Sequence, residues 1–300
     1  MLKGGIAAAV LGVAFVLAGF WAGFVLARQN DTSLSSAAPA APGAAGTPRP
    51  SFTGLQAAVA QLAGSAGATA GVTLTELGGP NPQTWSLNGD ETFTAASTYK
   101  LPLLMEEAEN VGAGRWHGTD SLCYQDSDWE DGYYGDYQNG VCMSRSQLEH
   151  RVGLNSDNTA AHILVRYGGG GSALNKYAQA HGAKQSAFYD PNTTTTNDLA
   201  RLWADEAAGH AGGRAAQQYL YPMLTHTSYE DGIPAGVPSG TTVVHKIGIL
   251  DSVVNDAALV PKGPHGAYVL TICTQGPGGD AGWKLLADIS HIVWQFEASR

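Results

Sequence analysis

Ser97 and Lys100 are the first residues in this chain whose types and spacing could do chemistry. They lie three positions apart, directly before the apolar run 101–105, and residues three apart share one face of a helix. A serine hydroxyl becomes a strong nucleophile when a neighbouring group takes its proton, and a desolvated lysine can be that group. A helix N-terminus at Ser97 would also favour developing negative charge. By itself, however, such a pair is more often a helix cap followed by a surface lysine.

Two further motifs follow this pair along the chain. The triplet Ser156-Asp157-Asn158 precedes a helical pattern, and Lys246-Ile247-Gly248 lies in a strand-like run. Alone, the first is typical of a helix N-cap and the second of a strand-end lysine. Together with Ser97-x-x-Lys100 they give Ser-x-x-Lys, Ser-Asp-Asn and Lys-x-Gly in that order. Three such motifs rarely occur in this order by chance, so they indicate one site.

With these motifs, residues 53–300 resemble the class A β-lactamase-like, penicillin-recognising serine hydrolases. The stretches Asp231-Gly232-Ile233-Pro234 and Asn255-Asp256, on either side of the third motif, are also similar to that family. The resemblance implies an α+β fold, in which a five-stranded antiparallel sheet lies beside an all-helical lobe with the site between them. It also implies a small β-lactam or peptidoglycan-peptide substrate, with no cofactor and no metal.

The resemblance assigns catalytic roles to three side chains. Ser97 attacks an activated carbonyl carbon and becomes acylated, Lys100 takes its proton, and Ser156 relays a proton to the leaving nitrogen. The backbone N–H groups of Ser97 and Ile249 are expected to form the oxyanion hole, a role that needs no particular side chain.

Substrate binding is expected to fall to residues of the second and third motifs. Asn158 would bond a substrate amide, Lys246 would attract a substrate carboxylate, and Gly248 and Ile249 would contact the substrate from the same strand. Asp157 is expected to be structural, bonding inward to hold its loop.

The chain departs from the family pattern at two places. The family supplies a Glu that activates the deacylating water, but residues 182–192 contain no Glu, and Asp190 is their only carboxylate. We therefore expect an acyl-enzyme that hydrolyses slowly. In addition, Ile247 replaces the usual Thr, and no Arg follows in residues 252–255, which removes donors for a substrate carboxylate.

The elements that must position these residues follow from hydrophobic periodicity. Helices are predicted over 52–64, from Ser97 onward, and over 144–150, 160–167, 172–181, 195–208, 215–224 and 283–296; strands are predicted over 68–77, 84–87, 242–249, 257–260 and 267–273. The first and last strands could form one antiparallel sheet, with the terminal helices on its outer face and the helical middle as a second lobe.

Residues 115–143 differ from the rest of the chain. They hold six acidic residues and six aromatic ones, and no Lys or Arg lies between Trp116 and Ser144. A calcium loop is one interpretation, although the ligand spacing of an EF-hand is missing. An ordinary solvated loop is another, and a lid that lines the site and selects substrates is a third.

The three cysteines indicate the compartment. Cys123 and Cys142 bracket this loop, and in an exported protein they are predicted to form a disulfide. The alternative is a pair of free thiols in a cytoplasmic protein. Cys273 lies in an apolar strand pattern and is expected to be a buried core residue.

The N-terminal region predicts three segments. Residues 4–26 are apolar and uncharged, long enough to span a bilayer, so residues 1–28 are predicted to be a signal anchor and transmembrane helix. A cleaved signal peptide, followed by secretion, is the alternative. Residues 29–51 are rich in Ala and Pro and are expected to be a disordered linker. The hydrolase domain would then cover 52–300, outside the cytoplasm on a single-pass membrane anchor.

The charge balance excludes one class of partner. The net charge is -10, and nucleic-acid binding needs a basic face, so we expect no nucleic-acid partner. We also expect the protein to be a monomer. Two other functions remain open: a binding module with a decayed site, and a His-based metalloenzyme. The nine His are scattered without a ligand-like spacing, which fits the second poorly.

Overall fold

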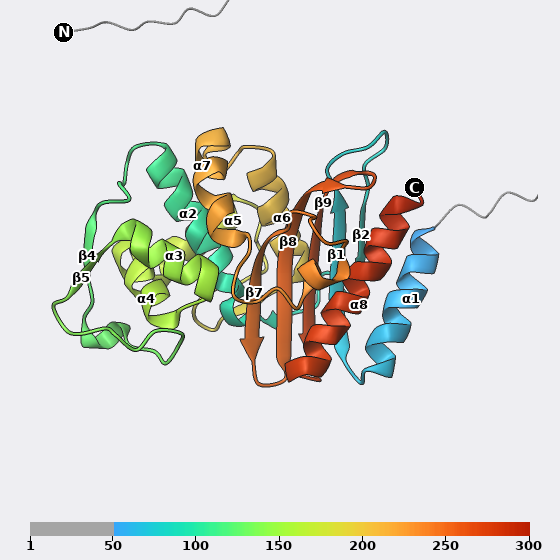
Figure 1. Cartoon of the computed structure of the whole chain (residues 1–300), viewed down its shortest axis with the longest axis horizontal. Coiled ribbons are helices and arrows are strands. Elements are labelled where there is room, and N and C mark those ends of the chain that lie inside the picture. The colour runs from blue at the N-terminus through green and yellow to red at the C-terminus, as the bar shows by residue number, and fades with distance from the viewer. Residues whose placement is uncertain (1–50) are drawn as a thin grey trace, which may run out of the picture. The chain divides into compact units, whose positions relative to one another are not determined.

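The core of the fold is a five-stranded sheet in which every neighbouring pair is antiparallel (Figure 1). In the order β2-β1-β9-β8-β7, its strands are Thr84–Leu87, Thr69–Glu76, Gly266–Gln275, Val253–Gly263 and Val244–Leu250. The pairing of β1 with β9 joins the two ends of the domain, as predicted from the sequence. Strand β7 is left at the edge, next to the helical lobe.

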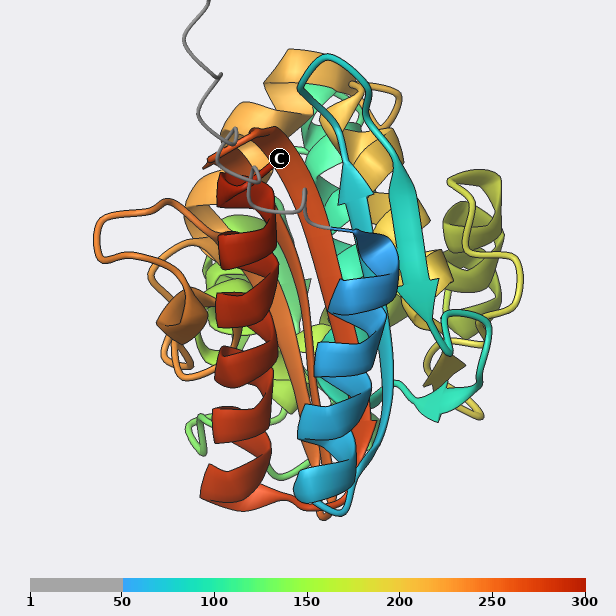
Figure 2. The ribbon, with the colours of Figure 1, turned by 90° about the vertical axis from the view of Figure 1, so that its right-hand side faces the viewer.

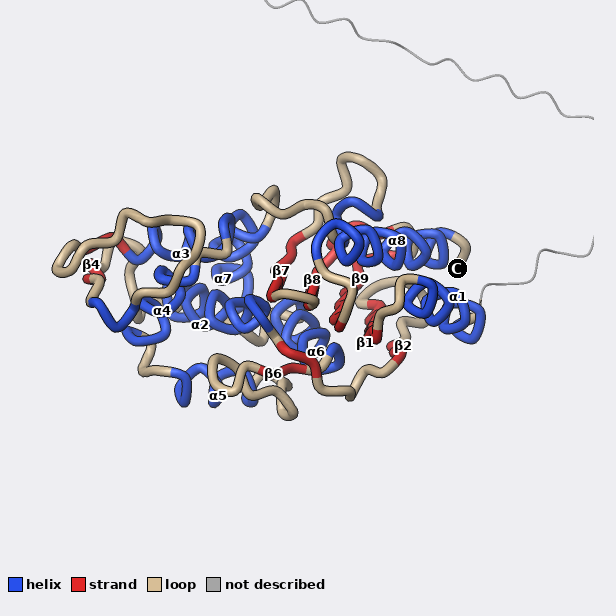
Figure 3. The backbone as a smooth tube through the Cα atoms, turned by 90° about the horizontal axis from the view of Figure 1, so that it is seen from below, coloured by secondary structure: helices blue, strands red, loops and turns tan. Residues whose placement is uncertain are grey.

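Two helices cover one face of this sheet. The first, α1 (Phe52–Ser65), and the last, α8 (Gly279–Ala298), lie side by side (Figure 2). Their buried side chains, such as Val59 and Ile289, pack against Leu74 and Leu270 of the sheet. Helix α6 (Thr196–Ala207) lies on the opposite face (Figure 3). The sheet is therefore buried on both faces, in agreement with the predicted layers.

The middle of the chain forms the helical lobe. Its helices are α2 (Lys100–Gly112), α3 (Arg145–Asn155), α4 (Asn158–Tyr167), α5 (Gly171–Ala180) and α7 (Gly213–Leu220). Four short strands form two small ladders: β3 (Phe93–Thr94) with β6 (Thr193–Thr194), and β4 (Ser121–Cys123) with β5 (Cys142–Ser144). Sequence periodicity predicted none of these four strands, because runs of two or three residues carry no period.

Strand β8 is longer than the predicted 257–260, because it continues through two buried polar residues. The Nδ2 atom of Asn255 donates to the carbonyl oxygen of Thr94 at 2.9 Å, and a carboxylate oxygen of Asp256 lies 3.0 Å from Nδ1 of His245. Polar side chains that find such partners can be buried inside a sheet, but in the sequence they interrupt the apolar pattern.

The structure, a computed structural model, describes residues 51–300. The predicted anchor at 1–28 and the linker up to residue 50 lie outside this range. Within the described range, none of the helices has both the length and the apolar character needed to cross a membrane.

Candidate active site

Ser97 lies in a single 3-10 turn, Ala96–Tyr99, that leads directly into α2. The α-helix itself begins at Lys100, three residues later than predicted. Ala96 adopts a positive φ of 47°, which bends the chain sharply as it leaves β3. The turn therefore presents a half-buried serine at the junction of the sheet and the lobe.

Lys100 is completely buried behind this serine. Its Nζ atom lies 3.0 Å from Ser97 Oγ, 2.6 Å from the carbonyl oxygen of Ser156 and 2.5 Å from Asn158 Oδ1. Burial lowers the pKa of Lys100 to about 7, although Glu130 and Asp157 act in the opposite direction. Near neutral pH a large fraction of this amine is thus unprotonated and able to take a proton from Ser97.

Ser156 joins two helices of the lobe. It adopts a left-handed conformation with φ of 56° at the end of α3, just before α4 begins. The next residue, Asp157, caps α4 by accepting a hydrogen bond from the backbone N–H of Ala160 at 2.8 Å. It also accepts from Tyr137 Oη and from the backbone N–H of Tyr134. Asp157 thus holds the loop that aims Ser156.

Asn158 is the first residue of α4 and connects the lysine to the loop above it. Its Oδ1 atom accepts from Lys100, and its Nδ2 atom donates to the carbonyl oxygen of Asp131 at 2.6 Å. These two bonds fix the plane of the amide. One N–H of Nδ2 remains for a ligand, because an Asn amide nitrogen carries two hydrogens.

Lys246, on β7, approaches Ser156 from the sheet. Its Nζ atom donates to Ser156 Oγ at 2.8 Å and to the carbonyl oxygen of Ile247 at 3.1 Å. Burial, together with the nearby charge of Lys100, keeps the pKa of Lys246 well below its usual range. The two lysines therefore lie on either side of Ser156, and both can exchange protons with hydroxyl groups.

Gly248 allows β7 to pass very close to the serine turn. A Cβ atom at this position would lie 2.6 Å from the carbonyl oxygen of Ala95 and 3.1 Å from the backbone nitrogen of Ser97. Only glycine fits without a shift of backbone. This close passage puts the third motif beside the first.

The residues around Ser97 enclose a cavity of about 430 Å³. Its walls are formed by Ser97, Gly132, Tyr133, Asn155, Ser156, Asn158, Tyr229, Ile247 and Ile249. A larger cavity, of about 510 Å³, lies along α3, but among the residues of the three motifs none lines it. The cavity at Ser97 is thus the one in which the motifs converge.

Comparison with known families agrees with this geometry. A model described as the β-lactamase enzyme family matches residues 54–296. The chain belongs to this family. A comparison with curated protein sequences found no match.

Solved structures also place the chain among β-lactamase-like folds. The structure of PBP-A is 26% identical, with a TM-score of 0.76, and the match covers 83% of this chain and 97% of that one. A point mutant of PBP-A, solved as an acyl-enzyme complex with penicillin G, is similar to the same degree and is covered to 98%. A β-lactamase from Sphaerobacter thermophilus DSM 20745 is 27% identical, with a TM-score of 0.74 and coverage of 82% and 98%.

The segment where family members would carry the deacylating Glu lies directly beside the serine turn. The carbonyl oxygen of Asn192 accepts from the backbone N–H of Ala95 at 2.9 Å, and its Nδ2 atom donates to the carbonyl oxygen of Ala96 at 3.1 Å. Asp190, the only carboxylate of this segment, is exposed. This segment thus brings an amide, not an acid, next to Ala96.

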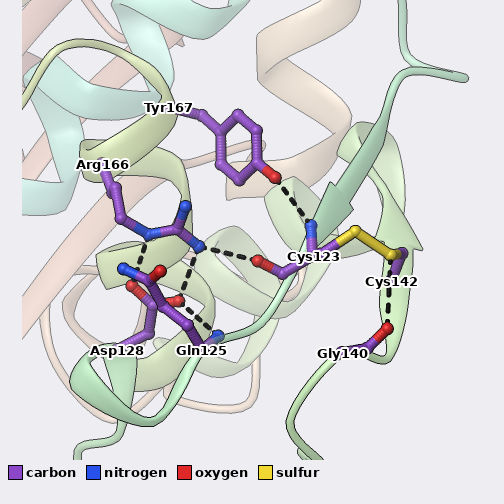
Figure 4. Close-up of a disulfide and its surroundings, with 7 residues drawn as sticks. All are labelled: Cys123, Gln125, Asp128, Gly140, Cys142, Arg166 and Tyr167. Carbon is purple, nitrogen blue, oxygen red and sulfur yellow. Dashed lines mark hydrogen bonds and ion pairs between the residues drawn. A yellow bond between two sulfur atoms is a disulfide. The ribbon is translucent and has the colours of Figure 1, made fainter.

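The acidic, aromatic loop is pinned at both ends. Cys123 and Cys142 form a disulfide across the β4–β5 ladder (Figure 4). Beside it, Arg166 of α4 donates to Asp128 at 2.7 and 2.8 Å and to the carbonyl oxygen of Cys123 at 2.7 Å. Further along the loop, Gly132 and Tyr133 form part of the cavity wall. The structure therefore brings this loop to the site, as the lid hypothesis requires.

Sequence reasoning missed a carboxylate that this loop brings close to Lys100. Glu130 Oε2 lies 2.8 Å from His162 Nε2, and the Thr159 hydroxyl bonds both the N–H and the carbonyl oxygen of Glu130. The hydrogen bond to His162 lowers the pKa of Glu130, and the charge of Lys100 contributes. One sequence signal could have indicated that a further polar group lies near the site. His162, the partner of Glu130, follows Asn158 by four residues and therefore lies on the same face of α4 as Asn158.

His245 of β7 is a buried ion-pair partner. Its Nδ1 atom lies 3.0 Å from Asp256 Oδ1, and its Nε2 atom lies 3.2 Å from Glu230 Oε1. Burial acts to lower the pKa of His245, but the two carboxylates outweigh it and raise the pKa to about 9. At neutral pH this imidazolium holds β7 and β8 together next to Lys246.

Proposed function

We propose that this chain is a serine hydrolase that opens a β-lactam ring or another amide through an acyl-enzyme on Ser97. The observation that carries the proposal is the 3.0 Å separation between Ser97 Oγ and the Nζ atom of a buried lysine. The pKa of that lysine, lowered to about 7, makes it a base at neutral pH. Membership of the β-lactamase enzyme family supports the same reaction class.

The mechanism follows from the hydrogen bonds of the site. Ser97 Oγ attacks the carbonyl carbon while its proton passes to Lys100 Nζ. The resulting negative charge on the carbonyl oxygen is proposed to be stabilised by the backbone N–H groups of Ser97 and Ile249. The close approach of Gly248, the neighbour of Ile249, to the backbone nitrogen of Ser97 supports this pairing. Collapse of this intermediate breaks the C–N bond and leaves the acyl group on Ser97.

The leaving nitrogen must gain a proton as that bond breaks. Ser156 Oγ, which lines the cavity, supplies this proton and is reprotonated by Lys246, whose Nζ atom lies 2.8 Å away. The free N–H of Asn158 binds the carbonyl of the amide on the acyl side. Both roles use groups whose positions are already fixed by hydrogen bonds, so little reorganisation is needed.

Deacylation is proposed to be slow. Residues 182–192 supply no Glu to activate a water, and Asp190 is exposed to solvent. A penicillin-sensing protein or a peptidase acting on D-Ala-D-Ala peptides would behave in this way, and the similarity to PBP-A supports this alternative to a rapid β-lactamase. A decayed binding module is less favoured, because both lysines and both serines of the site keep mutual hydrogen bonds.

A time course of acylation and deacylation tests the reaction and its slow step together. The protein is mixed with nitrocefin, penicillin G and a D-Ala-D-Ala peptide, and covalent adduct and free product are measured at intervals. We expect an adduct that accumulates to one per molecule and decays slowly. Steady nitrocefin hydrolysis that disappears in Ser97→Ala would overturn slow deacylation while leaving the nucleophile intact.

We also propose that the domain is a monomer, exported and held at the cell membrane by its N-terminal segment. The apolar residues 4–26, the Ala- and Pro-rich residues 29–51 and the disulfide all support this placement. Protease added to intact cells should digest the domain, whereas a protected domain would argue for the cytoplasm. Recovery in the soluble, secreted fraction would indicate a cleaved signal instead, and gel filtration tests the monomer.

A further inference from the structure

The cavity at Ser97 offers no exposed charge to a substrate. Among the nine residues that line it, none has a charged side chain. The nearest cations are Lys100 and Lys246, whose side chains lie beneath the surface and are at most 1% exposed. The Nζ atoms of both already bond groups of the protein.

The wall beside Ser156 is apolar. Because Ser156 supplies the proton to the leaving nitrogen, this wall faces the leaving group. It is built from Ile247 and Ile249 of β7, and Ile249 is 38% exposed. On the neighbouring strand, Val254 stands opposite Ile249. No side chain of this wall can donate a hydrogen bond to an anion.

The rim of the cavity is aromatic. Tyr133 and Tyr229 line it from two different loops, and Tyr133 is 52% exposed. A carboxylate entering here would lose water and gain no exposed cation.

We propose that the natural substrate carries no free carboxylate on the leaving-group side of the bond that Ser97 attacks. The substrate class is therefore an uncharged amide or ester, with an apolar or aromatic group that contacts Ile249 and the two tyrosines. A D-Ala-D-Ala peptide, whose leaving D-Ala carries a free carboxylate, is then not the natural substrate, and neither is a β-lactam with a free carboxylate. This inference rests on the proposed acylation of Ser97. Burial and the charge of Lys100, which lower the pKa of Lys246, support it by weakening the charge of the lysine on the same strand as this wall.

For such a substrate, the chemical steps are the same as those proposed above for the acyl-enzyme on Ser97. Ser97 Oγ forms a bond to the carbonyl carbon, and the C–N or C–O bond of the substrate breaks. The proton of Ser97 moves to Lys100, the leaving group takes a proton from Ser156, and Lys246 reprotonates Ser156. Water then adds its hydroxyl to the acyl carbon and its proton to Ser97, and the acid is released. Transfer of the proton held by Lys100 to Lys246 restores both amines, so atoms and charge balance without a further reactant.

A matched pair of acyl donors tests the inference. Acylation rate constants are measured by intact-mass spectrometry for penicillin G and for its methyl ester, each divided by the rate at which hydroxide opens its β-lactam ring. We expect the ester to acylate Ser97 at least as fast as the acid, whereas a site that made one charge-assisted hydrogen bond to the carboxylate would favour the acid by about tenfold. An acid that reacts about tenfold faster than the ester would overturn the inference while supporting the acyl-enzyme.

Two variants isolate the role of the apolar wall. Ile247→Thr restores a hydroxyl donor, and Ile247→Val has nearly the same shape without it. We expect the acid-to-ester rate ratio to rise about tenfold in Ile247→Thr relative to Ile247→Val. Equal ratios in the two variants would contradict the inference. If neither penicillin acylates any of these proteins, the proposed function fails, and this inference fails with it.

Discussion

The Nζ atom of Lys246 lies 2.8 Å from Ser156 Oγ, while the Nζ atom of Lys100 lies 2.6 Å from the carbonyl oxygen of the same serine. Two buried amines thus contact one residue from opposite lobes of the fold. Burial lowers the pKa of both amines, and the charge of Lys100 lowers the pKa of Lys246 further. The arrangement favours proton transfer near neutral pH over permanent charge.

The acylation rate should follow the protonation of Lys100. Since burial lowers its pKa to about 7 and the neutral amine is the base, the rate should rise with pH and level off above about 7. Lys100→Arg should lower the rate by about 10²-fold to 10⁴-fold, because a guanidinium stays protonated. Stopped-flow acylation from pH 5 to 9 checks both, and a flat profile in the unsubstituted protein would exclude Lys100 as the base.

Glu130 should tune this profile without touching the reacting atoms. Its charge raises the pKa of Lys100 against the effect of burial, so Glu130→Gln should move the rising limb of the profile to lower pH. Asp131→Asn is the matched control, because Asp131 is the exposed next residue and contacts Asn158 only through its backbone oxygen. A limb that shifts equally in both variants would assign the effect to general surface charge.

Gly248→Ala should separate the lobes at the active site. The added Cβ would meet the backbone of Ala95 and Ser97, so β7 must move away from the serine turn. We expect acylation to fall by about 10²-fold, the loss typical of misplaced reacting groups. Gly64→Ala, with open space around its Cβ on α1, is the control and should leave acylation unchanged.

Circular dichroism shows whether the Gly248→Ala variant keeps its secondary structure, which separates a local effect at the active site from misfolding. A variant that keeps its secondary structure yet acylates normally would show that the contact between β7 and Ser97 is unimportant.

His245 should make stability depend on alkaline pH. Its pKa is raised to about 9 in the folded protein, above the value of about 6.5 expected when unfolded. A raised pKa means that the stabilisation is fully present below pH 6.5 and is lost as pH rises through about 9. It should reach at most about 3 kcal/mol. Urea unfolding between pH 6 and 10 should show this loss in the unsubstituted protein and not in His245→Gln; parallel curves would contradict it.

The part of the site that could be predicted from the sequence is the part formed by contiguous motifs. Ser97 and Lys100 lie together at the start of α2, and Ser156 and Asn158 lie together at the start of α4. Their short spacing was therefore enough to predict that the members of each pair are close in space. The antiparallel sheet followed from apolar strands at both chain ends. Glu130 could not be placed, because its position depends on the path of a loop that a disulfide and Arg166 determine only in three dimensions. The polar start of β8 could not be predicted as strand for a similar reason. Asn255 and Asp256 are buried only because they form hydrogen bonds with residues from other parts of the chain.

The most direct test of the nucleophile is to locate the adduct that penicillin G leaves on the protein. After a short incubation and acid quench, the protein is digested, and the modified peptide is identified by tandem mass spectrometry. We predict a single penicilloyl group on Ser97, absent in Ser97→Ala and much reduced in Lys100→Arg. An unmodified Ser97 after prolonged incubation, or an adduct on any other residue, would contradict the assignment of Ser97 as the residue that is acylated.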